Sequence, residues 1–185
     1  MEERLEQNGE APHVDFSLQL SLDKNSEHVE SSIFEWLKII ASEVAEGKLE
    51  PLGALIVLGD FEQNQAKIEG IVQMKPKQNP IESYIVIDGE DSKEHIVEFS
   101  SAPFDGAIIV NRSGQILGAG IYLVVDNPLL DMPDDCGTRH KAAASFSERN
   151  DVISVSTLSE ETNTVRVWKD GKTKNVFRVD KTKEK

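Results

Sequence analysis

The stretch Pro51-Leu52-Gly53-Ala54-Leu55-Ile56-Val57-Leu58-Gly59 is the part of the chain that most directly indicates its fold. Its apolar run is short, is bounded by glycines and becomes β-branched toward its end, and these features favour a buried central strand. The segments on either side should therefore supply the remaining strands and the covering helices.

An amphipathic helix is predicted upstream of this strand. Apolar side chains recur at helical spacing from Val29 to Val44, and Trp36 widens the apolar stripe. Gly47 is typical of a helix stop. The aromatic side chains of this helix are interpreted as core packing rather than as a ligand site.

The two ends of the chain are polar. Residues 1–25 carry little periodicity, so we expect a flexible N-terminal arm, and the charged residues 181–185 are expected to form a loose tail. Within the arm, residues 15–22 alternate between polar and apolar side chains, which is typical of a strand. Such a strand would pair with a sheet edge or belong to a segment further upstream.

Downstream of the central strand, helix and strand signals are interspersed. A hairpin is predicted where residues 107–110 and 115–117 flank the turn Asn111-Arg112-Ser113-Gly114, with residues 118–123 extending its second arm. Short helices are expected at residues 92–100 and at about 139–149. Further strands are expected at residues 84–88, 152–156, 164–168 and 175–179, and the polar residues 60–83 are given no regular element.

These elements predict an α/β protein with a single domain, in which a mixed parallel and antiparallel central sheet has helices packed on both faces. The hairpins argue against a purely parallel, doubly wound sheet. A chain of 185 residues suffices for one domain with its own core, which we place at residues 26–180.

The composition is that of an acidic globular protein, with 38% hydrophobic residues, 29% charged residues and a formal net charge of −13. Such a chain lacks the broad basic face that DNA, RNA or an anionic membrane requires. No apolar run approaches the ~20 residues of a membrane span, and the N-terminus lacks the basic and apolar regions of a signal peptide. We therefore expect a cytoplasmic protein with no direct membrane insertion.

A single cysteine, Cys136, excludes an internal disulfide and a cysteine zinc site. Although His140 is close in sequence, nothing completes a nucleophilic constellation, so Cys136 is interpreted as a small residue packed under a loop. His13, His28 and His95 are scattered and are expected at the surface.

The segment Gly137-Thr138-Arg139-His140-Lys141-Ala142-Ala143-Ala144 places three basic or ionisable side chains after a glycine turn, at the start of a predicted helix. A helix start presents unpaired N–H groups and the positive end of the helix dipole, so it is suited to phosphate. Arg139 could grip a phosphate bidentately, Lys141 could act as a point charge, and His140 could ligate a metal or a phosphate. The alternative is a charged first turn paired with nearby acids. Because cations at a helix start oppose the dipole, the anion-binding interpretation is favoured.

Two acidic loops carry further candidate chemistry. In Phe104-Asp105-Gly106-Ala107, an acid stands directly before a buried strand, at a strand end where α/β proteins commonly place ligands. In Leu158-Ser159-Glu160-Glu161-Thr162, adjacent carboxylates between two strands could bind a hard divalent cation that bridges phosphates. Taken alone, each loop is better explained by turn carboxylates that cap local N–H groups or face solvent.

In combination, these segments resemble the diadenylate cyclase (DAC) domain family, whose members make cyclic di-AMP from two ATP molecules. The family pattern is a Gly-Ala-Leu-Ile strand, an Asp-Gly-Ala motif, a Gly-x-Arg-His-Arg-x-Ala motif and a Ser-Glu-Glu turn, in that order. The chain carries Gly53-Ala54-Leu55-Ile56, Asp105-Gly106-Ala107, Gly137-Thr138-Arg139-His140-Lys141-Ala142-Ala143 and Ser159-Glu160-Glu161 in those places, so that the resemblance covers roughly residues 28–179. Each motif is weak alone, and the four in order are specific. The Asn79-Pro80 segment and the relaxed third motif make the chain most similar to the soluble archaeal-type branch.

The resemblance implies a reaction that needs two copies of the chain. Each protomer would bind one ATP, and two protomers would meet face to face in a homodimer or higher homo-oligomer. Each ribose 3′-hydroxyl would then attack the α-phosphate of the other ATP, which yields cyclic di-AMP and two pyrophosphates. The implied cofactor is Mg²⁺ or Mn²⁺.

The same resemblance implies a site made of four groups of residues. They are catalytic (Asp105, Gly106 and Ala107), ATP phosphate-binding (Gly137, Thr138, Arg139, His140 and Lys141), adenine- or ribose-binding (Gly120, Tyr122, Leu123 and Ser159) and metal-binding (Asp105, His140 and Glu160).

The chain departs from the family pattern at two positions. Lys141 stands where a second arginine is usual, which keeps the charge but loses the planar guanidinium fork. Phe104 stands where a polar residue such as histidine is common. The alternative function is a non-catalytic module that binds ATP or cyclic di-AMP, and a third reading is an adaptor domain whose basic motif pairs internally.

Overall fold

A mixed sheet of seven strands forms the centre of the computed structural model, which describes residues 16–62, 68–104, 106–125, 132 and 136–179. The order of strands across the sheet is β2-β4-β3-β1-β5-β6-β7. Among the paired strands of these described residues, β1 and β3 are parallel and the other pairs are antiparallel. The strands are β1 (Ala54–Gly59), β2 (Ile71–Gln73), β3 (Ala107–Asn111), β4 (Ile116–Leu123), β5 (Val152–Leu158), β6 (Thr164–Lys169) and β7 (Lys172–Arg178).

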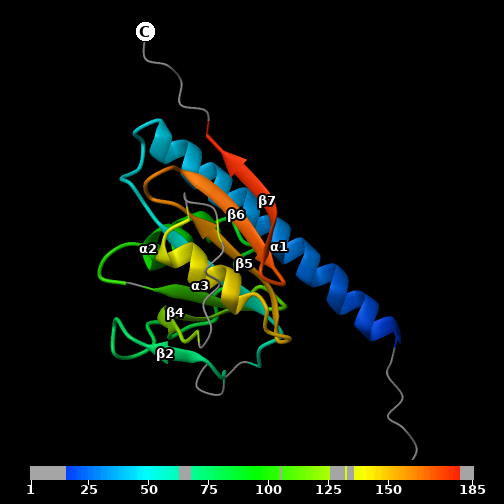
Figure 1. Cartoon of the computed structure of the whole chain (residues 1–185). Helices are drawn as coiled ribbons and strands as arrows, with labels where there is room; N and C mark the ends of the chain where they lie inside the picture. The colour runs from blue at the N-terminus through cyan, green and yellow to red at the C-terminus, as the bar shows by residue number, and fades with distance from the viewer. Residues whose placement is uncertain (1–15, 63–67, 105, 126–131, 133–135, 180–185) are drawn as a thin grey trace, which may run out of the picture.

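Helices cover both faces of this sheet, as the mixed α/β prediction required (Figure 1). Alternate residues of β1 divide between two apolar clusters. Ala54, Ile56 and Leu58 pack in one cluster with α1 (Phe16–Ala45) and α2 (Ser92–Ser100), whereas Leu55 and Val57 pack in the other with α3 (Thr138–Phe146). The predicted fold class is therefore confirmed, and the quoted stretch forms the strand at the centre of both clusters.

Helix α1 is longer than its apolar stripe predicted. The stripe itself is confirmed, since Val29, Ile33, Leu37 and Ile40 are each at most 1% exposed. The helix, however, already begins at Phe16, so the strand predicted for residues 15–22 is wrong. No Gly or Pro interrupts residues 16–45, and a helix whose C-terminal half is docked can extend upstream at little cost.

The domain limits at residues 26–180 stay a prediction, although the lower limit falls inside this helix. Residues 1–15 of the expected arm, the tail 181–185, and residues 126–131 and 133–135 of the loop before the basic segment lie outside the described residues. No helix in the described part of the chain is both long and apolar enough to cross a membrane.

Most of the remaining elements follow the sequence signals. The helix at 92–100 and the hairpin between β3 and β4 are confirmed, while α3 ends three residues earlier than expected, at Phe146. The strand predicted at residues 84–88 is reduced to one bridge between Val86 and Gln115, because the chain turns as soon as Ile87 has donated its N–H to the Gly114 carbonyl. The short strand β2 falls in a stretch that was given no element.

Candidate functional site

The signature segments gather at one edge of the sheet, where β1 and β3 begin. These two strands are parallel, with Ile56 opposite Ile108, so Gly53 and Gly106 precede them at the same edge. The antiparallel neighbours end there, since Ala107 pairs with Ile121 of β4 and Ala54 pairs with Leu158 of β5. Residues more than 100 positions apart in sequence thus meet at what we call the signature edge. It lies at the amino ends of β1 and β3, whereas open parallel sheets place ligands at the carboxyl ends.

The start of α3 has the geometry of an anion site. Its N-cap residue, Gly137, is extended, and no side chain among the described residues caps the helix. The Lys141 N–H donates to the Gly137 carbonyl at 3.2 Å. The N–H groups at the first positions of a helix have no acceptor in the helix itself, and in α3 these positions begin with Thr138 and Arg139. Gly137 and Thr138 are exposed, so a phosphate can approach these donors directly.

Arg139 links this helix start to the central strand. Its half-buried guanidinium lies against Gly53, so closely that a β-carbon at Gly53 would overlap it. Gly53 is therefore the residue that leaves room for a cation at the amino end of β1. Lys141, which replaces the usual arginine, is half-buried one helix position beyond His140.

His140 is placed differently from its neighbours, because it is buried rather than exposed at the helix start. It is 4% exposed, and its Nε2 lies 3.3 Å from Nη1 of Arg166, a residue of β6 that is also 4% exposed. Its ring packs edge-on against Trp168, with ring centroids 6.1 Å apart. A phosphate or metal could use Nε2 only if Arg166 moved.

The Asp-Gly-Ala segment is described from Gly106 onward, and Asp105 itself lies outside the described residues. Gly106 has a φ of +141° and lies so close to the Ile121 backbone that a β-carbon would overlap it. Only glycine can hold this conformation and this approach. Ala107 follows as a fully buried residue of β3. Phe104 is half-buried against the core, where its ring packs edge-on against Phe99 with ring centroids 5.5 Å apart.

The residues predicted to hold adenine or ribose lie at the end of β4 and after β5. Tyr122 is 55% exposed, whereas its neighbour Leu123 is buried. Gly120 has a φ of +70°, and its carbonyl accepts the Met74 N–H at 3.0 Å. Ser159 is buried and tied into its turn, because its carbonyl accepts the Asn163 N–H at 3.0 Å and its N–H donates to the Thr164 carbonyl at 2.9 Å.

The acidic turn itself is open to solvent, since Glu160 and Glu161 are exposed directly after Ser159. Within the described residues, no group of three or more His, Cys, Asp or Glu side chains could hold a metal ion. The proposed metal set includes Asp105, which is outside those residues, so the metal prediction stays a prediction.

Sequence reasoning missed Arg166 and a segment, here called the strap (residues 73–79), whose side chains bond to β4. Arg166 stands between two valines in an alternating strand, and this lone charge on the face shared by Thr164 and Trp168 was the available signal. In the strap, the Asn79 side-chain amide donates to the Leu117 carbonyl at 2.7 Å, and the Gln73 amide donates to the Ala119 carbonyl at 2.9 Å. The polar character of this segment concealed that it lies on the sheet.

The residues interpreted as structural behave largely as expected. Cys136 is buried beside the apolar cluster under α3. His28 is exposed and contacts Asp88 at 3.1 Å. His95 was expected at the surface but is half-buried, because its ring stacks on Phe99, and His13 lies outside the described residues.

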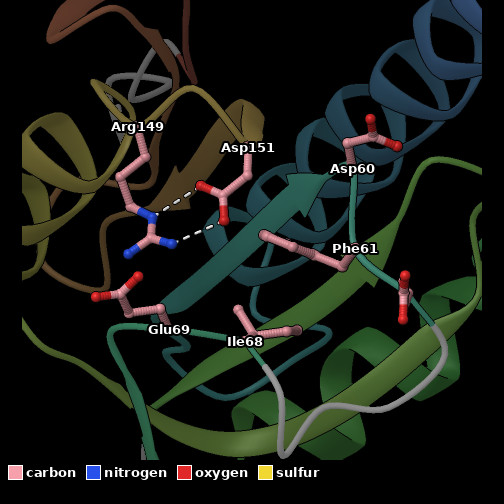
Figure 2. A pocket seen from close by; sticks show the side chains of 7 residues that line it. Asp60, Phe61, Ile68, Glu69, Arg149 and Asp151 are labelled. Carbon is pink, nitrogen blue, oxygen red and sulfur yellow. Dashed lines mark hydrogen bonds and ion pairs between the residues drawn. The ribbon is translucent and has the colours of Figure 1, made fainter. Parts of the chain in front are cut away.

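A cleft of about 400 Å³ opens at the other end of β1 (Figure 2). Arg149 and Asp151 form a bidentate ion pair on its wall, with nitrogen–oxygen distances of 2.9 and 2.7 Å. This hydrogen bond lowers the pKa of the Asp151 carboxyl and raises the pKa of Arg149. Four of its lining residues are acidic, so the cleft offers an anion no counterpart of Arg139 and Lys141 at the start of α3. Its lining residues are Asp60, Phe61, Glu62, Ile68, Glu69, Arg149 and Asp151.

The fold and the signature edge define an α/β domain that presents a helix start and an Arg side chain to an anion. The family model described as the DisA bacterial checkpoint controller nucleotide-binding (DAC) domain matches residues 42–173. Since this match covers well over half of the chain, the chain belongs to the DAC family.

Two archaeal relatives are named diadenylate cyclase. The protein of Methanocaldococcus jannaschii is 32% identical over 166 residues, which are 89% of this chain and 50% of that protein. The protein of Haloferax volcanii is 31% identical over 126 residues, which are 68% of this chain and 44% of that protein. The chain therefore spans about half the length of these relatives.

Two solved structures share the fold. DacA from Staphylococcus aureus, crystallised as a double mutant, is 27% identical with a TM-score of 0.52, and the match covers 82% of this chain and 87% of DacA. A hypothetical membrane spanning protein from Bacillus cereus is 21% identical with a TM-score of 0.56, over 82% and 63% of the two chains, and it supports the fold alone.

Proposed function

We propose that this chain is a diadenylate cyclase, which condenses two ATP molecules into cyclic di-AMP and two pyrophosphates. The observation that carries the proposal is the seating of the Arg139 guanidinium on Gly53, because it brings the anion-binding helix start to the edge where Gly106 lies against β4. Membership of the DAC family and the names of the archaeal relatives support the same activity.

The phosphate groups of ATP are assigned to the start of α3. Arg139 and Lys141 would neutralise the triphosphate, and the N–H groups of the first turn would donate to its oxygens. The exposed Thr138 hydroxyl adds a further donor. In this position they would stabilise the charge that develops as pyrophosphate leaves.

The nucleophile is assigned to the Asp-Gly-Ala segment. Asp105 would orient or deprotonate the ribose 3′-hydroxyl. The next residue, Gly106, packs on the backbone of Ile121, and Tyr122 and Leu123 follow on β4 as the proposed adenosine contacts. The chemistry then rests on positioning and charge neutralisation, and it needs no covalent enzyme intermediate.

Of the three predicted metal ligands, the two carboxylates suit Mg²⁺ or Mn²⁺ better than the imidazole nitrogen does. Mg²⁺ or Mn²⁺, when bound, would neutralise charge on the phosphate groups. The exposed carboxylate of Glu160 and the carboxylate of Asp105 are the ligands that we assign. His140 fits poorly, because its Nε2 faces the Arg166 guanidinium.

A turnover assay tests the proposal. Protein incubated with ATP and either Mn²⁺ or Mg²⁺ should yield cyclic di-AMP and pyrophosphate, resolved by chromatography. Binding of ATP without any product would indicate the non-catalytic module instead. An adaptor domain would show no nucleotide-induced thermal shift, whereas a ligand at 100 times its dissociation constant should stabilise the fold by about 2.7 kcal/mol.

A further inference from the structure

The contact between His140 and Arg166 is unusual because both side chains are almost completely buried. Each residue is 4% exposed, and Nε2 of His140 lies 3.3 Å from Nη1 of Arg166. His140 belongs to the first turn of α3, whereas Arg166 belongs to β6. The contact therefore ties the proposed phosphate-binding turn to a strand of the sheet.

The packing of α3 gives this tie a mechanical role. The middle of its buried face consists of Ala143 and Ala144, which allow the helix to approach the sheet but offer no large side chain that would resist rotation. Within α3, the larger buried side chains lie near its two ends and are those of His140 and Phe146. Within the first turn, His140 is the large buried side chain, so its contacts bear most directly on how that turn is rotated about the helix axis.

We propose that Arg166 is a positioning residue of the phosphate site. Arg166 holds His140 through a hydrogen bond and thereby fixes the direction in which the Arg139 side chain projects from α3. Arg139 immediately precedes His140 in α3, and its guanidinium must reach the space above Gly53. A small rotation of the first turn would move it out of that space. This inference rests on the proposed function only in taking the ligand to be a nucleoside triphosphate.

The hydrogen bond also fixes the tautomer of His140. A guanidinium carries donors and no acceptor, so Nε2 of His140 must supply its lone pair. The proton of the neutral ring therefore lies on Nδ1. The edge-on contact with Trp168, whose Nε1 donates to the Thr157 hydroxyl at 3.1 Å, keeps the ring in this orientation.

The test compares Arg166→Met with Arg166→Lys and with Arg149→Met. The ligand is 3′-deoxy-ATP, supplied with Mg²⁺. This nucleotide lacks the 3′-hydroxyl that acts as nucleophile in the proposed reaction, so calorimetry measures binding without turnover. We expect Arg166→Met to weaken binding by about tenfold, which corresponds to one hydrogen bond to a charged group. Arg166→Lys keeps a donor and should recover part of this loss. Arg149→Met removes an arginine in an ion pair at the far end of β1, and its affinity should stay within about twofold of the wild type.

A measurement on the unmodified protein keeps the proposal testable if Arg166→Met does not fold. Side-chain ¹⁵N NMR of the wild type should show an unprotonated Nε2 and a protonated Nδ1 for His140. A proton on Nε2, or wild-type affinity in a folded Arg166→Met variant, overturns the proposal. A wild-type protein that binds the triphosphate but makes no cyclic di-AMP overturns the proposed function and leaves the role of Arg166 standing.

Discussion

At the scale of single residues, the candidate site depends on two glycines that leave space for other groups. Gly53 admits the guanidinium of Arg139, and Gly106 admits the backbone of Ile121. The cost of filling the two spaces differs, because a guanidinium at the end of a flexible side chain can move whereas a strand backbone cannot. A substitution at Gly53 should therefore weaken nucleotide binding with little loss of folding stability, whereas one at Gly106 should lower folding stability as well.

Gly53→Ala should displace the Arg139 guanidinium and weaken binding of 3′-deoxy-ATP by about tenfold, the size expected for one charge-assisted contact. The free energy of unfolding should fall by no more than about 1 kcal/mol. Calorimetric titration and urea denaturation measure the two effects. Gly89→Ala is the matched control, since the nearest atom to its new methyl is the Val86 carbonyl oxygen at 3.9 Å. Unchanged affinity in both Gly53→Ala and Arg139→Ala would remove the phosphate role of Arg139.

Asp105→Asn should abolish formation of cyclic di-AMP while ATP binding stays within about twofold of wild type, because the amide cannot accept the 3′-hydroxyl proton. Chromatography of the products and calorimetry with ATP check the two parts. Asp60→Asn changes a carboxylate at the far end of β1 and should keep full turnover. If Asp105→Asn turns over ATP at the wild-type rate, Asp105 has no part in the chemistry.

At the scale of elements, the sequence predicted those whose periodicity was long or whose turn chemistry was distinct. The apolar stripe from Val29 to Val44 and the Asn111-Arg112-Ser113-Gly114 turn are of this kind. The sequence predicts a strand at residues 15–22 because helical and strand periods both fit so short a segment, and the docking of the rest of α1 decides for the helix. The three-residue β2 is too short to carry a pattern, and it exists because β4 offers it a partner.

The site was predictable to the extent that it consists of motifs with a local chemistry. The helix start at Gly137 follows from its own residues, because a glycine turn precedes an alanine-rich segment. The burial of His140 and the role of Arg166 could not be predicted, since they depend on which face of α3 meets which face of β6. Tertiary packing determines which faces meet, and the isolated charge of Arg166 between two valines is the sign of it that the sequence carries.

The turn between α3 and β5 gives a prediction of pH dependence. The hydrogen bond from Arg149 lowers the pKa of Asp151 in the folded protein below its unfolded value of about 4. The contribution of Asp151 to stability is therefore fully present above that unfolded value and is lost as the pH falls through the folded pKa. Urea denaturation of wild type and Asp151→Asn should show a stability difference at pH 6 that shrinks as the solution is acidified.

The partner of Asp151 supplies the control for this measurement. In an Arg149→Met background, the largest cause of the lowered pKa of Asp151 is gone, so Asp151→Asn should change the acid side of the stability curve much less. A stability difference between wild type and Asp151→Asn that is constant from pH 6 to the acid limit of folding would contradict the assignment.

At the scale of the whole molecule, the acidic chain concentrates its proposed chemistry at one edge. The formal net charge is −13, yet Arg139 and Lys141 follow each other closely at the start of α3. A single copy of this edge would bind one ATP and supply half of the reacting atoms. The proposed reaction therefore makes the association of two copies part of the catalytic cycle.

The specific activity should rise with protein concentration wherever the protein is largely monomeric, because only paired copies complete both attacks. Turnover per mole of chain, measured across a dilution series alongside light scattering, checks this expectation. Adding an excess of Asp105→Asn protein should suppress the wild-type rate by forming mixed pairs. A specific activity that does not change across the monomer range would exclude a two-copy mechanism.

The two ends of β1 also decide how the molecule can be tethered. The strand has six residues and so separates Gly53 from the acidic cleft near Asp60 by about 20 Å. A chain anchored to a sensor chip through the cleft end would leave its signature edge facing the solution, where a second copy could bind. Anchoring through the start of α3 would block this pairing by orientation alone, with the core of the molecule unchanged.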